Sequence, residues 1–283
     1  MKKLNNLFIA GFALLLAFGC EQPEDEKKDI GIQLWSVKEA MNSDAAGTIQ
    51  KLGEMGYTFV EPAGYSDGKF YNMQPAEFKK LVEDNGMRIL SSHTGQALPD
   101  SAKWDEIMAW WDEAIAAHKE LGVTYLVQPF MGSAGYDSLA GLANYVDYFN
   151  TIGEKAQSAG IQFGYHNHAK EFNELEGQII YDYMLENTDP EKVFFQLDLF
   201  WIKEGGKEAV KYFEKYPGRF KLWHVKDEAE LGASGEMDFA SVFAKKDQAG
   251  LEAIIVEVEE YNYEPIVSVE KSLEYLQTAD FVE

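Results

Sequence analysis

The 283-residue chain is poor in cysteine and in positive charge. Its single cysteine, Cys20, has no partner for an internal disulfide, which excludes a disulfide-stabilised fold. Lys and Arg together number 25 against 48 Asp and Glu, giving a formal net charge of −23 at pH 7. A surface of this sign repels nucleic acid and anionic lipid head groups. We therefore expect no nucleic-acid partner, and a neutral ligand rather than a phosphorylated one.

The apolar run Leu7–Gly19 is too short to span a bilayer as a helix but has the length of a signal-peptide hydrophobic segment. Cys20 and an acidic stretch follow it, an order that resembles a bacterial lipoprotein signal. We expect a signal peptide over residues 1–19, lipidation at Cys20 and an acidic tether over residues 20–28. The anchor would hold the protein at the cell envelope, on the periplasmic or outer-membrane face. An ordinary secretory signal is the alternative.

After residue 28, short β-rich apolar runs alternate with stretches of helical periodicity. The starts of these runs are Ile30, Thr58, Arg88, Thr124, Ile161, Val193, Phe220 and Ala253. No linker or change of composition interrupts the alternation. Residues 29–283 are therefore predicted to form a single domain of the α/β class, a (β/α)8 TIM barrel.

Glycine stands just before the strand at six of the seven helix-to-strand joints. These glycines are Gly56, Gly86, Gly122, Gly160, Gly218 and Gly250. A helix commonly closes with a left-handed residue, which glycine adopts without a steric clash, so the joints support the barrel. An open doubly wound sheet is the alternative. The lack of a glycine-rich phosphate loop after the first strand counts against a dinucleotide-binding fold.

Polar residues collect where the predicted strands end, which is where a TIM barrel holds its active site. They are Glu61, His93, Gln128, His166, His168, Gln196, Asp198, His224, Lys226, Glu257 and Glu259. Members of one strand lie two residues apart and so share a face. Converging buried imidazoles and carboxylates cost desolvation energy unless a cation compensates them. A divalent-metal site is one hypothesis, and a metal-free cluster that binds sugar hydroxyls is the other.

Short motifs on successive strands resemble the xylose isomerase-like TIM barrels of the sugar phosphate isomerase/epimerase superfamily. The motifs are Y-H-N-H-x-x-E-F from Tyr165, L-D-L-F-W from Leu197, H-V-K-D from His224, G-x-x-D-F from Gly235 and V-E-V-E from Val256. The resemblance covers the chain from about Ile30 onward. It implies one divalent metal held by His166, Asp198, His224 and Glu257. His166 departs from the family pattern, in which many members have glutamate.

That departure affects both the metal and the chemistry. Two imidazoles and two carboxylates favour Mn²⁺ or Zn²⁺, with Fe²⁺ or Co²⁺ also suited, over Mg²⁺. The lost glutamate puts the two-glutamate mechanism of several epimerases in doubt. Candidate bases are Glu257, His168 and Lys226. Lys226 alternatively donates to an enolate oxygen or pairs with Asp227.

Further residues are expected around the metal. Glu171 is expected to orient an imidazole. The expected substrate contacts are Glu61, His93, Gln128, Trp35, Trp201 and Glu259, and the expected apolar wall consists of Trp35, Tyr65, Phe130, Phe200 and Trp201.

The expected function is isomerisation or epimerisation of a non-phosphorylated keto-sugar through an enediolate. A metal-dependent lyase or hydratase acting on a 3-keto-sugar or related carbohydrate is the main alternative. A non-catalytic sugar-binding lipoprotein is a third, and a phosphodiesterase acting on abasic DNA is the least favoured. The expected partner is a small sugar. Contact with the membrane is expected only through the lipid at Cys20, and a homo-oligomer is an open alternative.

Overall fold

The computed structural model describes residues 28–282. The expected signal peptide, Cys20 and residues 21–27 of the expected tether lie outside this range. Lys28, at the start of the described chain, donates from its ammonium group to the carbonyls of Leu276 (3.3 Å) and Ala279 (2.6 Å). The beginning of the domain is therefore fixed to the C-terminal end of helix α12 (Pro265–Thr278).

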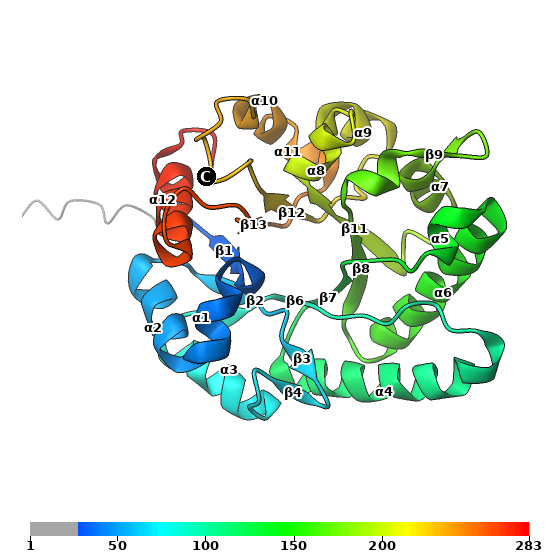
Figure 1. The fold of residues 1–283 in the computed structure, drawn as a ribbon, viewed down its shortest axis with the longest axis horizontal. Coiled ribbons are helices and arrows are strands. Elements are labelled where there is room, and N and C mark those ends of the chain that lie inside the picture. Colours follow the sequence, from blue (N-terminus) through cyan, green and yellow to red (C-terminus); the bar gives the residue numbers. More distant parts are fainter. Residues whose placement is uncertain (1–27, 283) are drawn as a thin grey trace, which may run out of the picture.

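All eight predicted strands form, and they build one parallel sheet (Figure 1). The strands are β1 (Ile30–Gln33), β2 (Phe59–Glu61), β5 (Arg88–Ile89), β6 (Ser91–His93), β7 (Tyr125–Gln128), β8 (Gln162–His166), β11 (Val193–Asp198), β12 (Leu222–Val225) and β13 (Ala253–Val256). The third predicted strand is split into β5 and β6 at Leu90. β5 pairs with β2 and β6 pairs with β7, so the sheet closes through this strand. The predicted (β/α)8 TIM barrel is confirmed.

Helices surround the barrel, and two short hairpins project from its loops (Figure 1). The α-helices are α1 (Lys38–Ser43), α2 (Ala45–Met55), α3 (Pro75–Asp84), α4 (Trp104–Leu121), α5 (Ala134–Asp137), α6 (Leu139–Ser158), α7 (Ile180–Asn187), α8 (Leu199–Glu204), α9 (Ala209–Lys215), α10 (Phe239–Phe243), α11 (Lys246–Ala249) and α12. The 3-10 helices are η1 (Leu34–Val37), η2 (Ser101–Lys103) and η3 (Ala169–Phe172). The hairpins are β3 (Tyr65–Ser66) with β4 (Lys69–Phe70), and β9 (Glu174–Leu175) with β10 (Gln178–Ile179).

The six glycines at the helix-to-strand joints all have positive φ, from 75° at Gly86 to 113° at Gly56. Gly56 closes α2 in the left-handed conformation, and its N–H donates to the carbonyls of Leu52 and Gly53. A side chain would be strained in this backbone conformation, which explains why glycine stands there. The joint pattern in the sequence was therefore a correct prediction of where the helices end.

The inside of the barrel is filled by apolar side chains, which form a plug beneath the polar strand ends. The plug consists of Phe59, Tyr125, Val127, Phe194, Leu222, Ala253 and Ile255. Gly31 leaves room for one of its rings, since an added Cβ would lie 2.0 Å from the Phe59 ring. Because inward positions recur every second residue, the strand-end residues two positions beyond the plug also point inward. The polar cluster therefore lies directly on top of the apolar plug.

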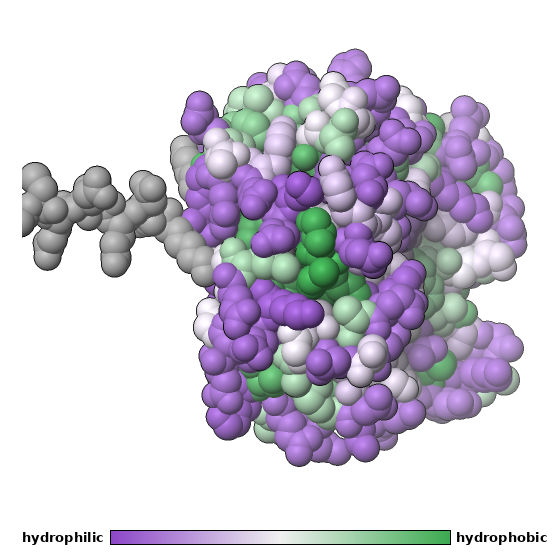
Figure 2. All heavy atoms as spheres, turned by 60° about the vertical axis from the view of Figure 1, so that its left-hand side comes forward, coloured by the Kyte–Doolittle hydropathy of each residue, from purple (hydrophilic) through white to green (hydrophobic). Residues whose placement is uncertain are grey.

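The face that carries α1, α2 and α12 is mainly hydrophilic and has a hydrophobic patch near its centre (Figure 2). Among the described residues, no helix combines the length and the apolar character needed to cross a bilayer.

Candidate functional site

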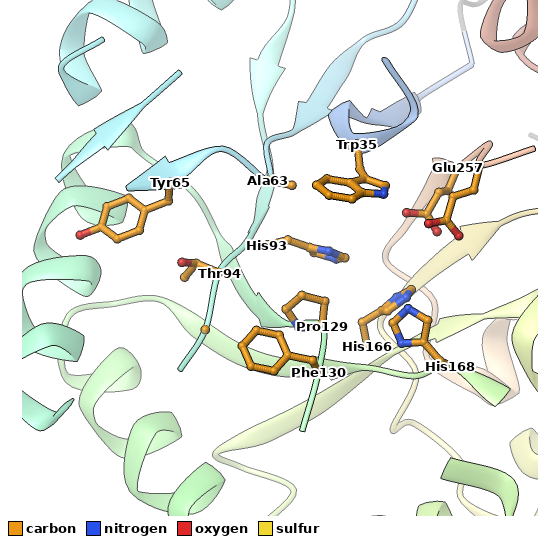
Figure 3. A pocket seen from close by; sticks show the side chains of 12 residues that line it. Trp35, Ala63, Tyr65, His93, Thr94, Pro129, Phe130, His166, His168 and Glu257 are labelled. Atoms are coloured by element: carbon orange, nitrogen blue, oxygen red, sulfur yellow. The ribbon is translucent and has the colours of Figure 1, made fainter. Parts of the chain in front are cut away.

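A cavity of about 460 Å³ opens at the C-terminal ends of the strands. It is lined by Trp35, Ala63, Tyr65, His93, Thr94, Gly95, Pro129, Phe130, His166, His168, Glu257 and Glu259. Figure 3 shows His166, His168 and Glu257 at one end of this pocket and Tyr65 and Thr94 at the other. The location agrees with the strand-end site that the sequence predicts.

The four residues expected to hold a metal lie together. His166, Asp198, His224 and Glu257 are buried and offer one ligand atom each, with all four atoms within 4.8 Å of one another. Strand register explains the proximity, since Asp198 on β11 is paired with His224 on β12. Glu257 follows β13 directly, and β13 is the next strand in the barrel. Four consecutive strands thus bring two imidazoles and two carboxylates to one point.

Two polar atoms of this cluster lack a hydrogen-bond partner. His166 Nδ1 and Asp198 Oδ2 are buried, and neither contacts a donor or acceptor among the described residues. The other oxygen of Asp198 accepts from the Trp201 N–H at 2.7 Å and caps α8. Burial raises the pKa of Asp198 to about 7, against the attraction of Lys226. Buried polar atoms are rarely left unpaired, so a ligand that binds both is the simplest account.

His224 is held from both sides by carboxylates. Its Nε2 lies 2.6 Å from Glu61 Oε1 and its Nδ1 lies 3.1 Å from Glu257 Oε2. Burial opposes a charge on this imidazole, but the two carboxylates outweigh it and raise the pKa of His224 to about 10. A carboxylate on one nitrogen of a histidine commonly orients the other nitrogen toward a metal. Glu61 therefore stands where it can support His224 as a ligand.

Lys226 lies beside the cluster and pairs with glutamates. Its ammonium lies 3.3 Å from Glu257 Oε2 and also contacts Glu259. Burial lowers its pKa, but the neighbouring carboxylates raise it to about 12, so Lys226 is a cation. The alternative pairing of Lys226 with Asp227 is wrong. Asp227 instead accepts from the N–H groups of Glu228 (2.8 Å) and Gly232 (3.0 Å), because it closes the loop after β12.

His168 lies next to the cluster but outside the four-residue set. It is partly exposed, lines the pocket, and its ring centroid is 5.0 Å from that of His166. Burial lowers the pKa of His168 against the opposing pull of Glu171 and Glu257. Asn167 faces away from the pocket, as the alternation predicts, and its Oδ1 accepts from the Asp198 N–H at 3.1 Å.

The Glu171 carboxylate does not bind an imidazole ring, which differs from the expectation. Its Oε2 accepts from the backbone N–H of His168 at 3.0 Å, and its Oε1 accepts from the hydroxyls of Tyr136 and Tyr165 at 2.8 and 2.6 Å. Glu171 is fully buried and is the third residue of η3. Its carboxylate fixes the backbone of His168, and its backbone N–H faces the His168 side chain in the capping box at the start of η3.

Three of the expected substrate contacts, Trp35, His93 and Glu259, line the pocket. Glu61 and Gln128 do not line it, and the Glu61 carboxylate and the Gln128 amide nitrogen bind other parts of the protein. Glu61 accepts from Gln33, Gln196 and His224 beneath the pocket floor. Gln128 donates to the carbonyls of Gln96 (3.0 Å) and Phe130 (2.9 Å).

Trp201, a further expected contact, lies behind the pocket wall. Its ring centroid is 5.7 Å from that of His168, and the Lys226 ammonium lies 5.1 Å from the Trp201 ring. Among the expected aromatic wall, Tyr65 and Phe130 line the pocket, whereas Phe200 packs on Trp201 with centroids 5.1 Å apart.

Sequence reasoning missed Gln33 and Tyr136. Gln33 ends β1, donates to Glu61 at 2.8 Å and accepts from the Trp35 N–H at 3.0 Å. The signal was present, because Gln33 is a polar residue at the end of an apolar strand. Tyr136 offered no such pattern, since it comes from α5 and reaches Glu171 across 35 residues of sequence.

A second group of possible ligands shares the site, formed by His93, His166 and His224. Nε2 of His93 lies 2.6 Å from Gln196 Oε1 and 3.1 Å from Glu61 Oε1, so this nitrogen carries the hydrogen and donates it to them. This group has no carboxylate to balance a divalent charge. The set with Asp198 and Glu257 is therefore the better cation site.

Comparisons with known proteins agree with the barrel fold. A crystal structure of a sugar phosphate isomerase/epimerase from Parabacteroides distasonis is 34% identical, covers 93% of this chain and all of that one, and superposes with a TM-score of 0.87. The structure of IolI protein with a bound zinc atom is 13% identical and covers 90% of this chain and 98% of that one, with a TM-score of 0.71, which shows the shared fold.

An inosose dehydratase from Geobacillus kaustophilus is 21% identical over 63% of this chain. This chain spans 60% of the length of that relative. The model of one protein family, described as xylose isomerase-like TIM barrel, matches residues 49–279. The chain belongs to the xylose isomerase-like TIM barrel family.

Proposed function

We propose that this protein is a divalent-metal-dependent enzyme that isomerises or epimerises a non-phosphorylated keto-sugar. The observation that carries the proposal is the buried cluster of His166, Asp198, His224 and Glu257, whose ligand atoms all lie within 4.8 Å of one another. The cluster opens into a cavity large enough for a small molecule. The similarity to a sugar phosphate isomerase/epimerase over nearly the whole chain supports the reaction class.

The donor set fits a divalent cation. It combines two imidazoles with two carboxylates, and two of its buried atoms have no protein partner. Imidazole donors suit Mn²⁺, Zn²⁺, Fe²⁺ and Co²⁺ better than Mg²⁺, and we favour Mn²⁺ or Zn²⁺. The zinc atom in the structure of IolI, a protein of the same fold, supports this choice. Such an ion supplies a Lewis acid that polarises a carbonyl and acidifies the adjacent C–H.

The neighbouring side chains supply the remaining chemistry. His168 reaches the pocket, lies outside the group of residues proposed to hold the metal, and is the candidate base for the proton next to the carbonyl. Glu171 fixes its backbone, so the imidazole starts from a defined position. Lys226 is buried beside Glu257 and donates to a developing negative oxygen. Glu257 remains a second candidate base, although His224 and Lys226 both hold its carboxylate.

The lining of the pocket favours a substrate without phosphate. Its charged residues besides histidine are Glu257 and Glu259, and no Lys or Arg is among the lining residues. Two carboxylates facing a phosphoryl group would repel it. The lining contains no Arg, the side chain whose guanidinium donors match a phosphate. The net charge of −23 adds to this repulsion.

A metal-dependent lyase or hydratase acting on a 3-keto-sugar is the second candidate. Epimerisation that removes and returns a proton on opposite faces uses two bases. Among the lining residues outside the proposed metal-ligand set, His93 bonds to Gln196 and Glu259 contacts Lys226, which leaves His168 as the candidate base. Elimination needs one base and one proton donor, which are the roles open to His168 and Lys226. The similarity to an inosose dehydratase also favours this candidate. Measuring the ultraviolet absorbance of an unsaturated product from 3-keto-sugars separates elimination from isomerisation.

The test of the cation site is a pair of matched substitutions, Asp198→Asn and Asp44→Asn. Both aspartates cap a helix N-terminus, Asp198 for α8 and Asp44 for α2, and Asn preserves the cap. Asp198→Asn removes a charged ligand and is expected to weaken Mn²⁺ binding at least ~100-fold, beyond the ~10–100-fold typical of outer partners. Asp44→Asn is expected to bind like the parent. Calorimetric titration and elemental analysis provide the measurements, and equal affinities in both variants would reject the site.

We also propose that Cys20 anchors the protein at the cell envelope. The proposal rests on the lipoprotein-like order of the first residues. Mass spectrometry of the mature protein tests it, because an acylated N-terminal cysteine at position 20 is required.

A further inference from the structure

Two of the three exposed large hydrophobic side chains among the described residues line the same pocket. Trp35 is 44% exposed and Phe130 is 41% exposed, and both line the same cavity as His166 and Glu257 of the proposed metal-ligand set. The third, Tyr263, is 53% exposed and is not among the lining residues. Large apolar surface left open to water inside a cavity is typical of a ligand-binding surface.

The pocket is divided into a polar end and an apolar end. Figure 3 shows His166, His168 and Glu257 at one end, with Trp35 above and Phe130 below the space next to them and with His93 and Pro129 between the two in this view. The apolar end is continued by Ala63, Tyr65, Thr94, Gly95 and Pro129. The polar end supplies all the groups that the proposed reaction needs. The apolar end is therefore available for a part of the substrate that does not react.

Trp35 is held in place by its backbone. It belongs to η1, and its N–H donates to Gln33 Oε1 at 3.0 Å, while Gln33 Nε2 donates to Glu61 at 2.8 Å. The Lys38 ammonium lies 4.3 Å from the centroid of the Trp35 ring, and Lys38 is not among the lining residues. A cation therefore lies over the Trp35 ring, and the ring is also part of the cavity lining.

Phe130 is held by a similar device. Its carbonyl accepts from Gln128 Nε2 at 2.9 Å, and the same amide donates to the Gln96 carbonyl at 3.0 Å. Gln128 is fully buried at the end of β7, so the loop that carries Phe130 is attached to the barrel. The backbone that carries each aromatic wall is therefore fixed before a ligand arrives, which lowers the entropic cost of binding.

The cavity volume agrees with a substrate larger than one sugar ring. About 460 Å³ lies within the ~300–1,000 Å³ range of pockets that bury most of a drug-sized ligand. Aromatic side chains that line a cavity suit a ring, since they pack against ring faces. We propose that the substrate is a glycoside, in which the reacting sugar lies at the metal cluster and a second ring lies between Trp35 and Phe130. This inference rests on the proposed function of the same site.

The experiment compares the methyl and the phenyl β-glycoside of glucose, of galactose and of mannose. The two members of each pair share the sugar, and only the phenyl glycoside carries a second ring. Affinities are measured by calorimetry with the purified protein in the presence of Mn²⁺. In at least one pair the phenyl glycoside is expected to bind about tenfold more tightly than the methyl glycoside, equivalent to ~1.4 kcal/mol. Trp35→Ala and Phe130→Ala are each expected to reduce this ratio to about threefold or less, because each removes one aromatic wall.

Tyr263→Ala is the matched control, since it removes an aromatic ring that is more exposed and outside the pocket. It is expected to keep the tenfold ratio. Thermal unfolding of all three variants checks that the fold is retained. The inference is overturned if no glycoside binds, if phenyl and methyl glycosides bind equally, or if the ratio survives in both Trp35→Ala and Phe130→Ala.

Failure of the proposed function would look different. If the parent protein does not bind Mn²⁺ but still prefers phenyl glycosides, the metal-dependent reaction is rejected and the second-ring subsite stands. Mn²⁺ binding and turnover of a small keto-sugar without a phenyl preference would do the reverse.

Discussion

The substitution Glu61→Gln tests how the polar cluster is supported from below. Glu61 is fully buried, and every neighbour that bonds to its carboxylate is a donor: Gln33 Nε2 (2.8 Å), Gln196 Nε2 (2.8 Å), His224 Nε2 (2.6 Å) and His93 Nε2 (3.1 Å). Burial would raise the pKa of this carboxyl, but the imidazoles of His93 and His224 hold it well below its usual range. Glu61 is therefore a buried anion.

The cost of the substitution follows from these bonds. Gln replaces one carboxylate oxygen by an NH₂ group, which must then face at least one donor. In the least costly arrangement the NH₂ faces Gln196, and the amide of Gln196 turns over and disturbs its 2.6 Å bond to His93. Leaving one buried donor unpaired costs ~1–3 kcal/mol of unfolding free energy. His224 keeps an acceptor but loses the negative charge behind it, which is expected to weaken Mn²⁺ binding ~10–100-fold.

Glu230→Gln is the matched control. Glu230 is also buried, and every neighbour that bonds to its carboxylate is a donor. Asn262 donates from its N–H (3.0 Å) and from Nδ2 (2.8 Å), and Ser268 donates from its hydroxyl. It lies outside the cluster, so this variant is expected to lose a similar free energy of unfolding with unchanged Mn²⁺ affinity. Urea unfolding and calorimetric titration provide the two measurements. Parental Mn²⁺ affinity in Glu61→Gln, or an equal loss of affinity in Glu230→Gln, would refute the supporting role.

Two further predictions concern stability. Burial lowers the pKa of His118 from 6.5 to about 4, so its contribution to stability is complete above pH 6.5 and is lost as the pH falls toward 4. Between pH 7.5 and pH 5 the parent is expected to lose ~2 kcal/mol of unfolding free energy through this group, measured by urea unfolding. This loss is expected to be absent in His118→Gln. A pH dependence that persists unchanged in the variant would assign it to other groups. Gly31→Ala places a Cβ 2.0 Å from the Phe59 ring and is expected to destabilise the fold by ~1–3 kcal/mol in thermal unfolding, whereas a parental transition would mean that the ring moves freely.

The sequence predicted the barrel because its local rules are periodic. Alternation along each strand and a glycine at most joints are local patterns, so they located all eight strands and the inward face. The same alternation, together with the family resemblance, placed His166, Asp198, His224 and Glu257 at one point. Strands that are adjacent in sequence are adjacent in this barrel, so the order of the motifs was also the order in space.

The roles of individual polar residues were harder to predict, because hydrogen bonds depend on distances across the barrel. Glu61 was expected to contact substrate, yet it lies under His224, which is 163 residues away in sequence. Glu171 was expected at an imidazole but is bound by Tyr136 and Tyr165, which no spacing rule connects to it. Parity gives the direction of a side chain and not its partner. Such partners become visible only when the loops are in place.

The buried amide of Gln33 links the two ends of the pocket. Its Oε1 accepts from the Trp35 N–H and its Nε2 donates to Glu61, which in turn holds His224. Turning this amide over would break both bonds. The orientation of the amide is therefore fixed by the Trp35 N–H and the Glu61 carboxylate together. The position of Trp35 is thereby tied to that of His224 through two hydrogen-bonded side chains. A substrate that spans both ends would therefore meet a wall and a polar cluster whose separation is set by the protein before binding, which is the arrangement that a glycoside requires and a single free sugar does not.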